Sequence, residues 1–394
     1  MKLQAVRSLL ALIVAPLATL PPAHFGIAEA TPTRALQPNE VNRIRDDQWH
    51  LRQLKVKEAH EITQGEGVTV AIPDTGVSPH PDLRKNLLTG IDIIPGGGGS
   101  GQQDRDSHGT GMAGLVAAHG QSKRTGALGI APKAKILPLY DTPAGGDGHP
   151  DNLAQSIEYA IDNGADIISI SSVGSTSSRL KQAVLTALAS NIVIVAAAGN
   201  RPEDSRVGYP ASEEGVIAVG GIDRLNQRAS VSVAGPEIDV VAPAVEIYST
   251  SIDGLYRKGT GTSNSTAIVA GAVALIRSKY PDLPASEVAH RLTATAIDKG
   301  PPGRDDEYGY GVIDLVAALT ADVPPLGFGS ATASAPTQAA STTAAAAEPV
   351  GDGDDGSTAR GLATLGVIVA AGGAWAVIAR RRRRGGDPPP RVSR

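Results

Sequence analysis

The sequence of 394 residues contains no cysteine. This absence excludes disulfide bonds, thiolate metal sites and a cysteine nucleophile. Aromatic residues make up only 3% of the chain while glycine occurs 46 times, so tight turns and close backbone packing must shape the core. Neither charge sign dominates, and the formal net charge of -4 gives no electrostatic reason to expect a nucleic-acid partner. A hydrophobic fraction of 41% is typical of a globular protein whose core can hold it without cross-links.

The N-terminus has the features of a secretory signal peptide. Lys2 and Arg7 precede an apolar run over residues 9–20. Ala28 and Ala30 then provide small residues at the spacing of a cleavage site. We therefore predict a signal peptide over residues 1–30 and an exported mature chain.

The C-terminus has the features of a membrane anchor. Residues 361–379 contain no charge and, as a helix, reach roughly the thickness of a bilayer's hydrocarbon core. The basic tail, residues 380–394, begins with five arginines. Because positive charge flanking a span stays cytoplasmic, we expect a single-pass protein of the cell membrane with its main domain outside. The alternatives are a buried core helix and a nucleic-acid-binding tail. Neither explains why the signal peptide and the orientation of the span both predict an exported domain.

Composition divides the rest of the chain into an extension (31–60), a folded domain (61–320) and a stalk rich in Pro, Ala, Ser and Thr (321–360) that cannot bury enough apolar surface to fold. Inside the domain, Val- and Ile-rich runs alternate with helical patterns, which predicts an α/β fold with a mainly parallel central sheet covered on both faces. Chemistry in such folds gathers at the carboxyl ends of the strands. The expected strands are 67–72, 135–139, 166–170, 192–197, 216–219 and 239–242, and the expected helices are 109–118, 152–163 and 178–190.

Three segments combine residue types suited to nucleophilic catalysis. In the first a strand runs into Asp74, in the second a helix follows His108, and in the third Ser263 opens a helix that is apolar nearly all round. A serine there can attack a carbonyl while its own N–H faces the developing oxyanion. It needs a histidine as base and a carboxylate to orient that histidine. Alone, each residue is more simply a turn residue, a structural histidine or a helix cap; their order and settings together favour catalysis.

These segments, Asp74-Thr75-Gly76, His108-Gly109-Thr110 and Gly261-Thr262-Ser263, resemble the signatures of the subtilisin-like serine proteases. The resemblance covers roughly residues 48–318. It implies a three-layer subtilisin-like domain, an Asp74, His108 and Ser263 triad, polypeptide substrates and no cofactor.

Two further segments resemble binding elements of that family. Asn200, at the end of Ala197-Ala198-Gly199-Asn200, corresponds to the oxyanion-hole asparagine and would donate beside the Ser263 N–H, although Gly-Asn is also a common turn dipeptide. Ser172-Val173-Gly174 is similar to the stretch that pairs with an extended substrate. The resemblance therefore predicts substrate contacts at Ser172, Val173, Gly174, Ala198 and Gly199.

A more specific resemblance is to the mycosins, subtilisin-like proteases associated with type VII secretion in actinobacteria. It rests on the order of segments from signal peptide to basic tail, on residues 47–51, and on residues 300–305 and 308–311. It implies a protease that processes exported proteins beside a type VII secretion membrane complex, with its extension packed on the domain. The alternatives are a structural subunit of that complex with catalysis secondary, and a general surface subtilase.

Some positions depart from the family pattern. Pro73 precedes Asp74, and a proline there either ends the strand harmlessly or shifts the carboxylate. Gly111 replaces a second histidine often found after the catalytic one. Asp104 and Asp106 have the composition of a calcium loop without its ligand spacing, so we predict a solvated loop and no metal. Arg257 and its neighbour Tyr256 are interpreted as solvated groups near the cleft.

Overall fold

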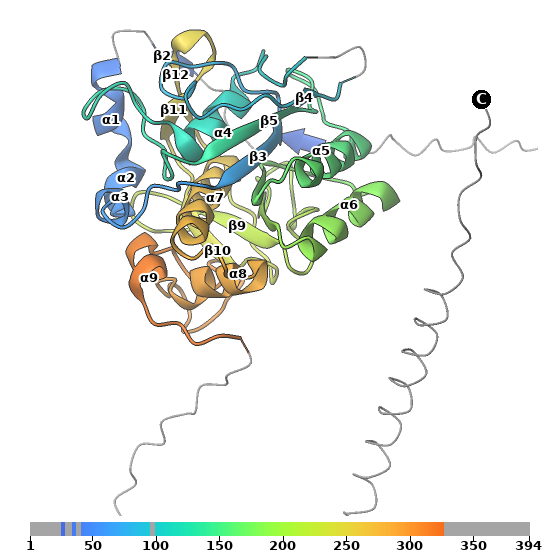
Figure 1. The fold of residues 1–394 in the computed structure, drawn as a ribbon. Helices are drawn as coiled ribbons and strands as arrows, with labels where there is room; N and C mark the ends of the chain where they lie inside the picture. Colours follow the sequence, from blue (N-terminus) through green and yellow to red (C-terminus); the bar gives the residue numbers. More distant parts are fainter. Residues whose placement is uncertain (1–24, 28–33, 37–40, 95–98, 327–394) are drawn as a thin grey trace, which may run out of the picture. The chain divides into compact units, whose positions relative to one another are not determined.

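The computed structural model describes residues 25–27, 34–36, 41–94 and 99–326 (Figure 1). The predicted transmembrane helix and basic tail, and most of the signal peptide and stalk, lie outside these residues. Within the described ranges, no helix combines the length and hydropathy that a membrane crossing requires.

A seven-stranded parallel sheet forms the centre of the domain, in the order β10-β9-β8-β6-β3-β5-β4. The first of these strands in the chain, β3 (Thr69–Asp74), lies inside the sheet between β5 (Lys135–Tyr140) and β6 (Ile167–Ile170). The chain builds one side of β3 before the other, and such a switch point opens a crevice at the carboxyl ends of the strands. The other strands are β4 (Ile91–Asp92), β8 (Val193–Ala197), β9 (Ile217–Ile222) and β10 (Val240–Pro243).

Helices cover both faces of this sheet, which confirms the three-layer α/β prediction (Figure 1). Their apolar side chains pack on the buried Val and Ile residues of the strands, forming one core on each face. One face carries α5 (Pro150–Asp162) and α6 (Ser178–Ala189), and the other carries α4 (His108–Ala117), α7 (Thr262–Lys279), α8 (Ala285–Ala294) and α9 (Leu315–Thr320).

Two small antiparallel sheets, which the sequence did not predict, flank the main one. The first joins β11 (Ile247–Thr250), β12 (Tyr256–Gly259) and β2 (Arg34–Leu36) of the extension. The second pairs β7 (Ser172–Gly174) with β1 (Phe25–Ile27), a strand that falls inside the predicted signal peptide.

The extension packs against the domain, as the resemblance implied. Its helices are short, and their apolar side chains, including Trp49, join the core on the α7 face. The side-chain amide of Gln48 is buried, donating to the carbonyls of Leu128 and Tyr248 and accepting from the Leu128 N–H. Each fully buried apolar side chain contributes roughly 1.5–3 kcal/mol, so the extension is part of the folded unit. Its helices are α1 (Ile44–Asp47), α2 (Trp49–Gln53) and α3 (Val56–His60).

Candidate active site

Asp74 and His108 contact each other at the carboxyl edge of the sheet. Asp74 is the last residue of β3 and His108 is the first of α4. The Nδ1 atom of His108 lies 2.8 Å from Oδ1 and 2.9 Å from Oδ2 of Asp74, and both side chains are buried. A carboxylate in this position keeps the proton on Nδ1 and leaves Nε2 unprotonated, so that Nε2 can act as a base. Pro73 pairs in register with Leu139, so it does not pull Asp74 out of reach.

The turn that leads into His108 is held by the buried carboxylate of Asp104. This carboxylate accepts hydrogen bonds from the N–H groups of Ser107 (2.9 Å), Asp106 (2.9 Å) and Thr110 (2.8 Å). It also accepts from the Thr75 hydroxyl at 2.9 Å. Burial raises the pKa of Asp104, while these hydrogen bonds act in the opposite direction. The prediction of a solvated loop is therefore wrong at Asp104, which orders the approach to the histidine.

Ser263 occupies the first turn of α7 and is fully buried. Its Oγ donates to the Ser171 carbonyl at 3.3 Å, and the Ser171 hydroxyl donates back to the Ser263 carbonyl at 3.3 Å. Ser171 lies between β6 and β7, so these bonds fix the serine beside the strand predicted to bind substrate. Since α7 also packs on α4, the two helices that carry Ser263 and His108 adjoin.

Asn200 presents a buried amide donor next to this serine. Its Oδ1 accepts from the Thr262 N–H at 3.0 Å and from the Thr262 hydroxyl at 3.3 Å. That pairing fixes which way the amide is turned. Nδ2 is buried and has no hydrogen-bond partner in the described part of the chain. A buried unpaired donor costs ~1–3 kcal/mol and is typical of a site that completes its hydrogen bonds only with a ligand.

The predicted substrate-binding residues gather at the same edge. Ser172, Val173 and Gly174 form β7, which already pairs with an extended segment of the chain, Ile27 lying opposite Ser172 and Phe25 opposite Gly174. Thus β1 runs toward Ser171 and the nucleophile. Ala198 and Gly199 directly follow β8, the strand next to β6 in the main sheet. Gly199 has a φ of +113°, which favours glycine, and its N–H donates to the Thr262 hydroxyl at 3.3 Å.

Comparison with known proteins identifies the family. The model of the subtilase family matches residues 65–311. This chain belongs to the subtilase family. It is 42% identical to subtilisin DY of Bacillus licheniformis over 260 residues, which cover 65% of this chain and 92% of that protein. It is also 42% identical to subtilisin E of Bacillus subtilis (strain 168) over 276 residues, covering 68% of this chain and 70% of that protein.

Solved structures agree with this membership. The crystal structure of MycP1 with the N-terminal propeptide removed matches with a TM-score of 0.64 and 32% identity, covering 70% of this chain and 98% of that one. A protease of Pseudoalteromonas arctica matches with the same TM-score and identity and covers 97% of its own chain. Together these relatives establish a subtilisin-type serine endopeptidase.

One buried carboxyl of this subtilase was not singled out in the sequence. Asp141 follows β5, and its backbone N–H donates to the Asp74 carbonyl at 3.0 Å. Its side chain accepts from the hydroxyls of Ser156 (2.7 Å) and Thr142 (3.0 Å). Burial, reinforced by the nearby Asp74 charge, raises the pKa of Asp141 to about 7. The only signal in the sequence is an acid directly after a buried strand, next to the strand that ends in Asp74.

The interpretation of Tyr256 and Arg257 as solvated groups is wrong. Their side chains are 1% and 2% exposed, respectively. The Tyr256 hydroxyl donates to Asp82 at 2.8 Å, and Arg257 donates to the carbonyls of Ser107 and His108 at the start of α4. Sequence hydropathy cannot show this, because the acceptors lie far away along the chain.

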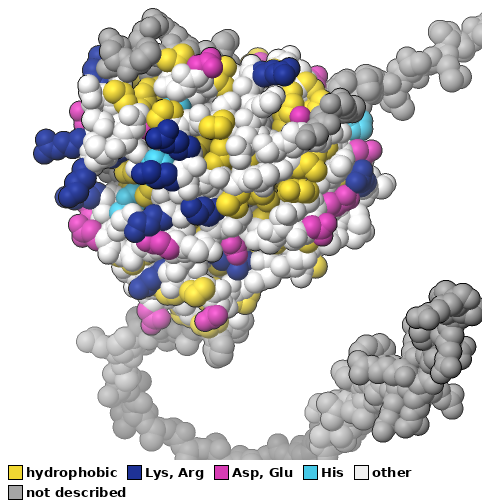
Figure 2. Space-filling view, turned by 45° about the horizontal axis from the view of Figure 1, so that its top comes forward, with side chains coloured by type: hydrophobic (Ala, Val, Ile, Leu, Met, Phe, Trp, Pro, Cys, Tyr) yellow, Lys and Arg dark blue, Asp and Glu magenta, His cyan; other side chains and the backbone are white. Residues whose placement is uncertain are grey.

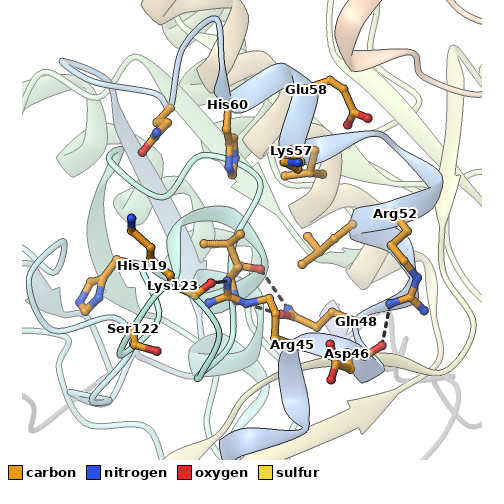
Figure 3. A pocket seen from close by; sticks show the side chains of 14 residues that line it. Arg45, Asp46, Gln48, Arg52, Lys57, Glu58, His60, His119, Ser122 and Lys123 are labelled. Carbon is orange, nitrogen blue, oxygen red and sulfur yellow. Dashed lines mark hydrogen bonds between the residues drawn. The ribbon is translucent and has the colours of Figure 1, made fainter.

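A hollow of about 940 Å³ lies away from the triad, where the extension meets the domain (Figure 3). Lys and Arg side chains gather on this side of the molecule, which lies at the left in Figures 1 and 2. The polar groups of its wall bind the chain itself: Arg45 donates to the carbonyls of Gly126 and Thr125, and the His60 ring pairs with the Ile130 carbonyl. The side chains around the hollow therefore hold the extension against the domain.

Proposed function

We propose that this subtilase is a membrane-anchored, extracytoplasmic endopeptidase in which Asp74, His108 and Ser263 form the catalytic triad. The observation that carries the proposal is the direct contact of Asp74 with His108 Nδ1, at 2.8 Å. Alone, that contact would fit a structural pair. The buried donor of Asn200, bonded to the residue before Ser263, gives the same edge of the sheet the group needed to stabilise an oxyanion.

The mechanism follows from these positions. His108 Nε2 takes the proton of the Ser263 hydroxyl while Oγ attacks the substrate carbonyl. Asp74 orients the ring and stabilises the imidazolium that forms. Asn200 Nδ2 and the Ser263 N–H hold the oxyanion. The imidazolium then protonates the leaving amine, which gives an acyl-enzyme, and water attacks that ester with His108 again as base.

Substrate binding is proposed to use the edge of β7 that β1 occupies in this structure. An extended polypeptide adds to this edge by main-chain hydrogen bonds, with little dependence on its sequence. The antiparallel pairing of β1 with Ser172, Val173 and Gly174 supports this mode, because it shows that the edge accepts a strand directed toward Ser263.

The cellular role is proposed to be processing of exported proteins beside a type VII secretion membrane complex. Two observations support it: the structural similarity to MycP1 over 98% of that chain, and the order of signal peptide, domain, stalk, span and basic tail in the sequence. The predicted anchor places the domain on the extracytoplasmic side.

A fluorophosphonate label tests the chemistry. Wild-type protein in solubilised membranes should be labelled at Ser263, and Ser263→Ala should take up no label while keeping the same melting temperature. A folded wild-type sample that stays unlabelled under conditions that label a control subtilisin contradicts the triad.

Secretion in a strain carrying Ser263→Ala separates the cellular alternatives. Unprocessed but normally exported substrates favour a structural subunit for export itself. Failed export at normal protein levels makes catalysis necessary. Normal export and processing, with no co-purifying membrane complex, leaves a general surface subtilase.

A further inference from the structure

The guanidinium of Arg257 lies directly behind the turn that carries His108. Arg257 stands in the middle of β12, where Ser249 of β11 and Ala35 of β2 flank it. Its side chain is 2% exposed, and a buried guanidinium is stable only when hydrogen bonded. Its Nη1 donates to the carbonyls of Ser107 at 3.2 Å and His108 at 3.3 Å.

Those carbonyls belong to a strained turn. Ser107 has a φ of +84°, a conformation that costs a residue other than glycine roughly 1–2 kcal/mol. Two buried side chains hold it: Asp104 accepts from the Ser107 N–H, and Arg257 donates to the Ser107 carbonyl. The direction in which the His108 ring leaves the helix depends on this peptide, because His108 is the next residue.

Gly111 explains how the arginine fits. A Cβ at this position would lie 2.6 Å from Cδ and 2.7 Å from Nη1 of Arg257. The Arg257 side chain therefore occupies the space that a side chain at position 111 of α4 would need. This gives a physical reason for the departure from the family pattern at Gly111.

The rest of the β11–β12 hairpin braces the same helix. The Ser249 hydroxyl donates to the Gly111 carbonyl at 2.6 Å, and the Thr250 hydroxyl donates to the Thr110 carbonyl at 2.6 Å. Hydrogen bonds from the hairpin thus reach carbonyls on both sides of His108.

From these contacts we infer that Arg257 is a positioning residue for His108, holding the Ser107 turn so that the imidazole meets both Asp74 and Ser263. The inference rests on the proposed triad. Loss of the guanidinium lets the turn relax, and a displacement of about 1 Å in a catalytic group costs roughly 10²-fold in rate. Substrate binding on β7 does not depend on this turn.

The test compares Arg257→Met with Arg277→Met in the full-length protein. Arg277 is a matched control: it is 7% exposed and also donates to backbone carbonyls, those of Asn191 and Leu283, but at the far end of α7. We expect Arg257→Met to lower kcat for a peptide substrate about 10- to 100-fold with KM changed less than about threefold. Arg257→Lys should recover part of that loss. Arg277→Met should lower the melting temperature and leave kcat within about twofold.

Other results overturn the inference. It fails if folded Arg257→Met keeps the wild-type kcat, or if both arginine variants lose kcat only in proportion to their unfolded fraction. Should Arg257→Met not fold, Gly111→Ala presses on the guanidinium from the other side, and a folded Gly111→Ala protein with wild-type kcat overturns the inference. Failure of the triad itself is distinct, because wild-type protein would then take up no fluorophosphonate.

Discussion

The side-chain oxygen of Asn200 accepts a hydrogen bond from the backbone N–H of Thr262, the residue before Ser263. This contact turns the amide so that its two donors point away from Thr262, and they have no partner among the described residues. Asn200→Ala should therefore lower kcat by ~10²–10³ with little change in KM, because the donor acts on charge that develops in the transition state. Steady-state kinetics with a peptide substrate measure both constants.

Thr262→Val is the control for this prediction. It removes the hydroxyl, which donates to Asn200 at 3.3 Å and accepts from the Gly199 N–H at 3.3 Å, and keeps the N–H that donates at 3.0 Å, so the amide stays oriented. We expect less than about a tenfold loss of kcat, since only the neutral bond of ~0.5–1.5 kcal/mol to Asn200 bears on the amide, and the Gly199 bond that is also lost does not orient it. Equal losses in the two variants would contradict the role assigned to Asn200.

Asp141→Asn should change how stability depends on pH. In the folded chain the pKa of Asp141 is about 7, above its ordinary value of 3.8. The folded state therefore keeps a proton that the unfolded state releases, and this favourable contribution is lost as pH rises from about 4 to about 7. Relative to the wild type, the free energy of unfolding of the variant should rise by an amount on the order of a few kcal/mol between about pH 4 and about pH 7. Above that range the difference should stay constant.

Urea unfolding at a series of pH values measures this difference. Both proteins should carry Ser263→Ala so that self-digestion does not distort the curves. A stability difference that stays constant from pH 4 to pH 8 would show that Asp141 ionises in the native protein as it does in the unfolded chain.

His50→Leu should make the protein more resistant to acid. His50 is buried in the extension, and neither ring nitrogen has a hydrogen-bond partner within the described chain. Burial lowers its pKa to about 3 from an ordinary 6.5. The unfolded state thus binds a proton first, and stability is lost as pH falls from about 6.5 toward 3.

Chemical unfolding at pH 4 and pH 8 tests this prediction. The leucine variant should be the more stable protein at pH 4. At pH 8 histidine is neutral in both states, so any difference there reports packing alone. If the wild type and the variant differ equally at the two pH values, His50 does not contribute to acid sensitivity.

Removal of residues 1–30 should open the substrate edge. The strand β1 lies within the predicted signal peptide and pairs with Ser172, Val173 and Gly174. A chain that begins at Thr31 lacks that strand, so an extended inhibitor does not have to displace β1 from β7. With ~0.5–1.5 kcal/mol for each lost ladder bond, labelling by a peptidyl fluorophosphonate should become roughly tenfold faster or more.

Gly26→Pro in the longer chain provides the matched comparison, because proline removes a ladder donor without shortening the protein. It should have an intermediate rate of labelling. A small fluorophosphonate that does not use β7 serves to normalise the active fraction. Equal peptidyl labelling of all three proteins would mean that β1 does not occlude the edge.

The main sheet was predictable because its strands are buried on both faces and read as runs of Val and Ile. The ends of the strands were harder to predict: β3 was expected to end at Ile72 and continues to Asp74, since Pro73 is accommodated within the sheet. Tyr256-Arg257 was misread because both residues are polar and the carbonyls that accept from Arg257, those of Ser107 and His108, lie far away along the chain. The burial of Asp104 and Asp141 could not be recognised either, although the backbone N–H groups that donate to Asp104 lie within six residues of it. Their burial depends on partners that the fold brings together.

The length of α7 separates Ser263 from the C-terminal part of the domain. With 18 residues, α7 measures about 27 Å, and Ser263 lies at its start. Beyond its other end, the Tyr280 hydroxyl donates to the Leu319 carbonyl of α9, and the last described residue, Leu326, donates its N–H to Glu287 of α8. A substrate bound beside the C-terminal end of α7 needs about eight extended residues to span this length and reach the Ser263 hydroxyl. In the proposed membrane-anchored enzyme, this separation is expected to favour substrates with long extended segments over proteins that stay folded close to the anchor.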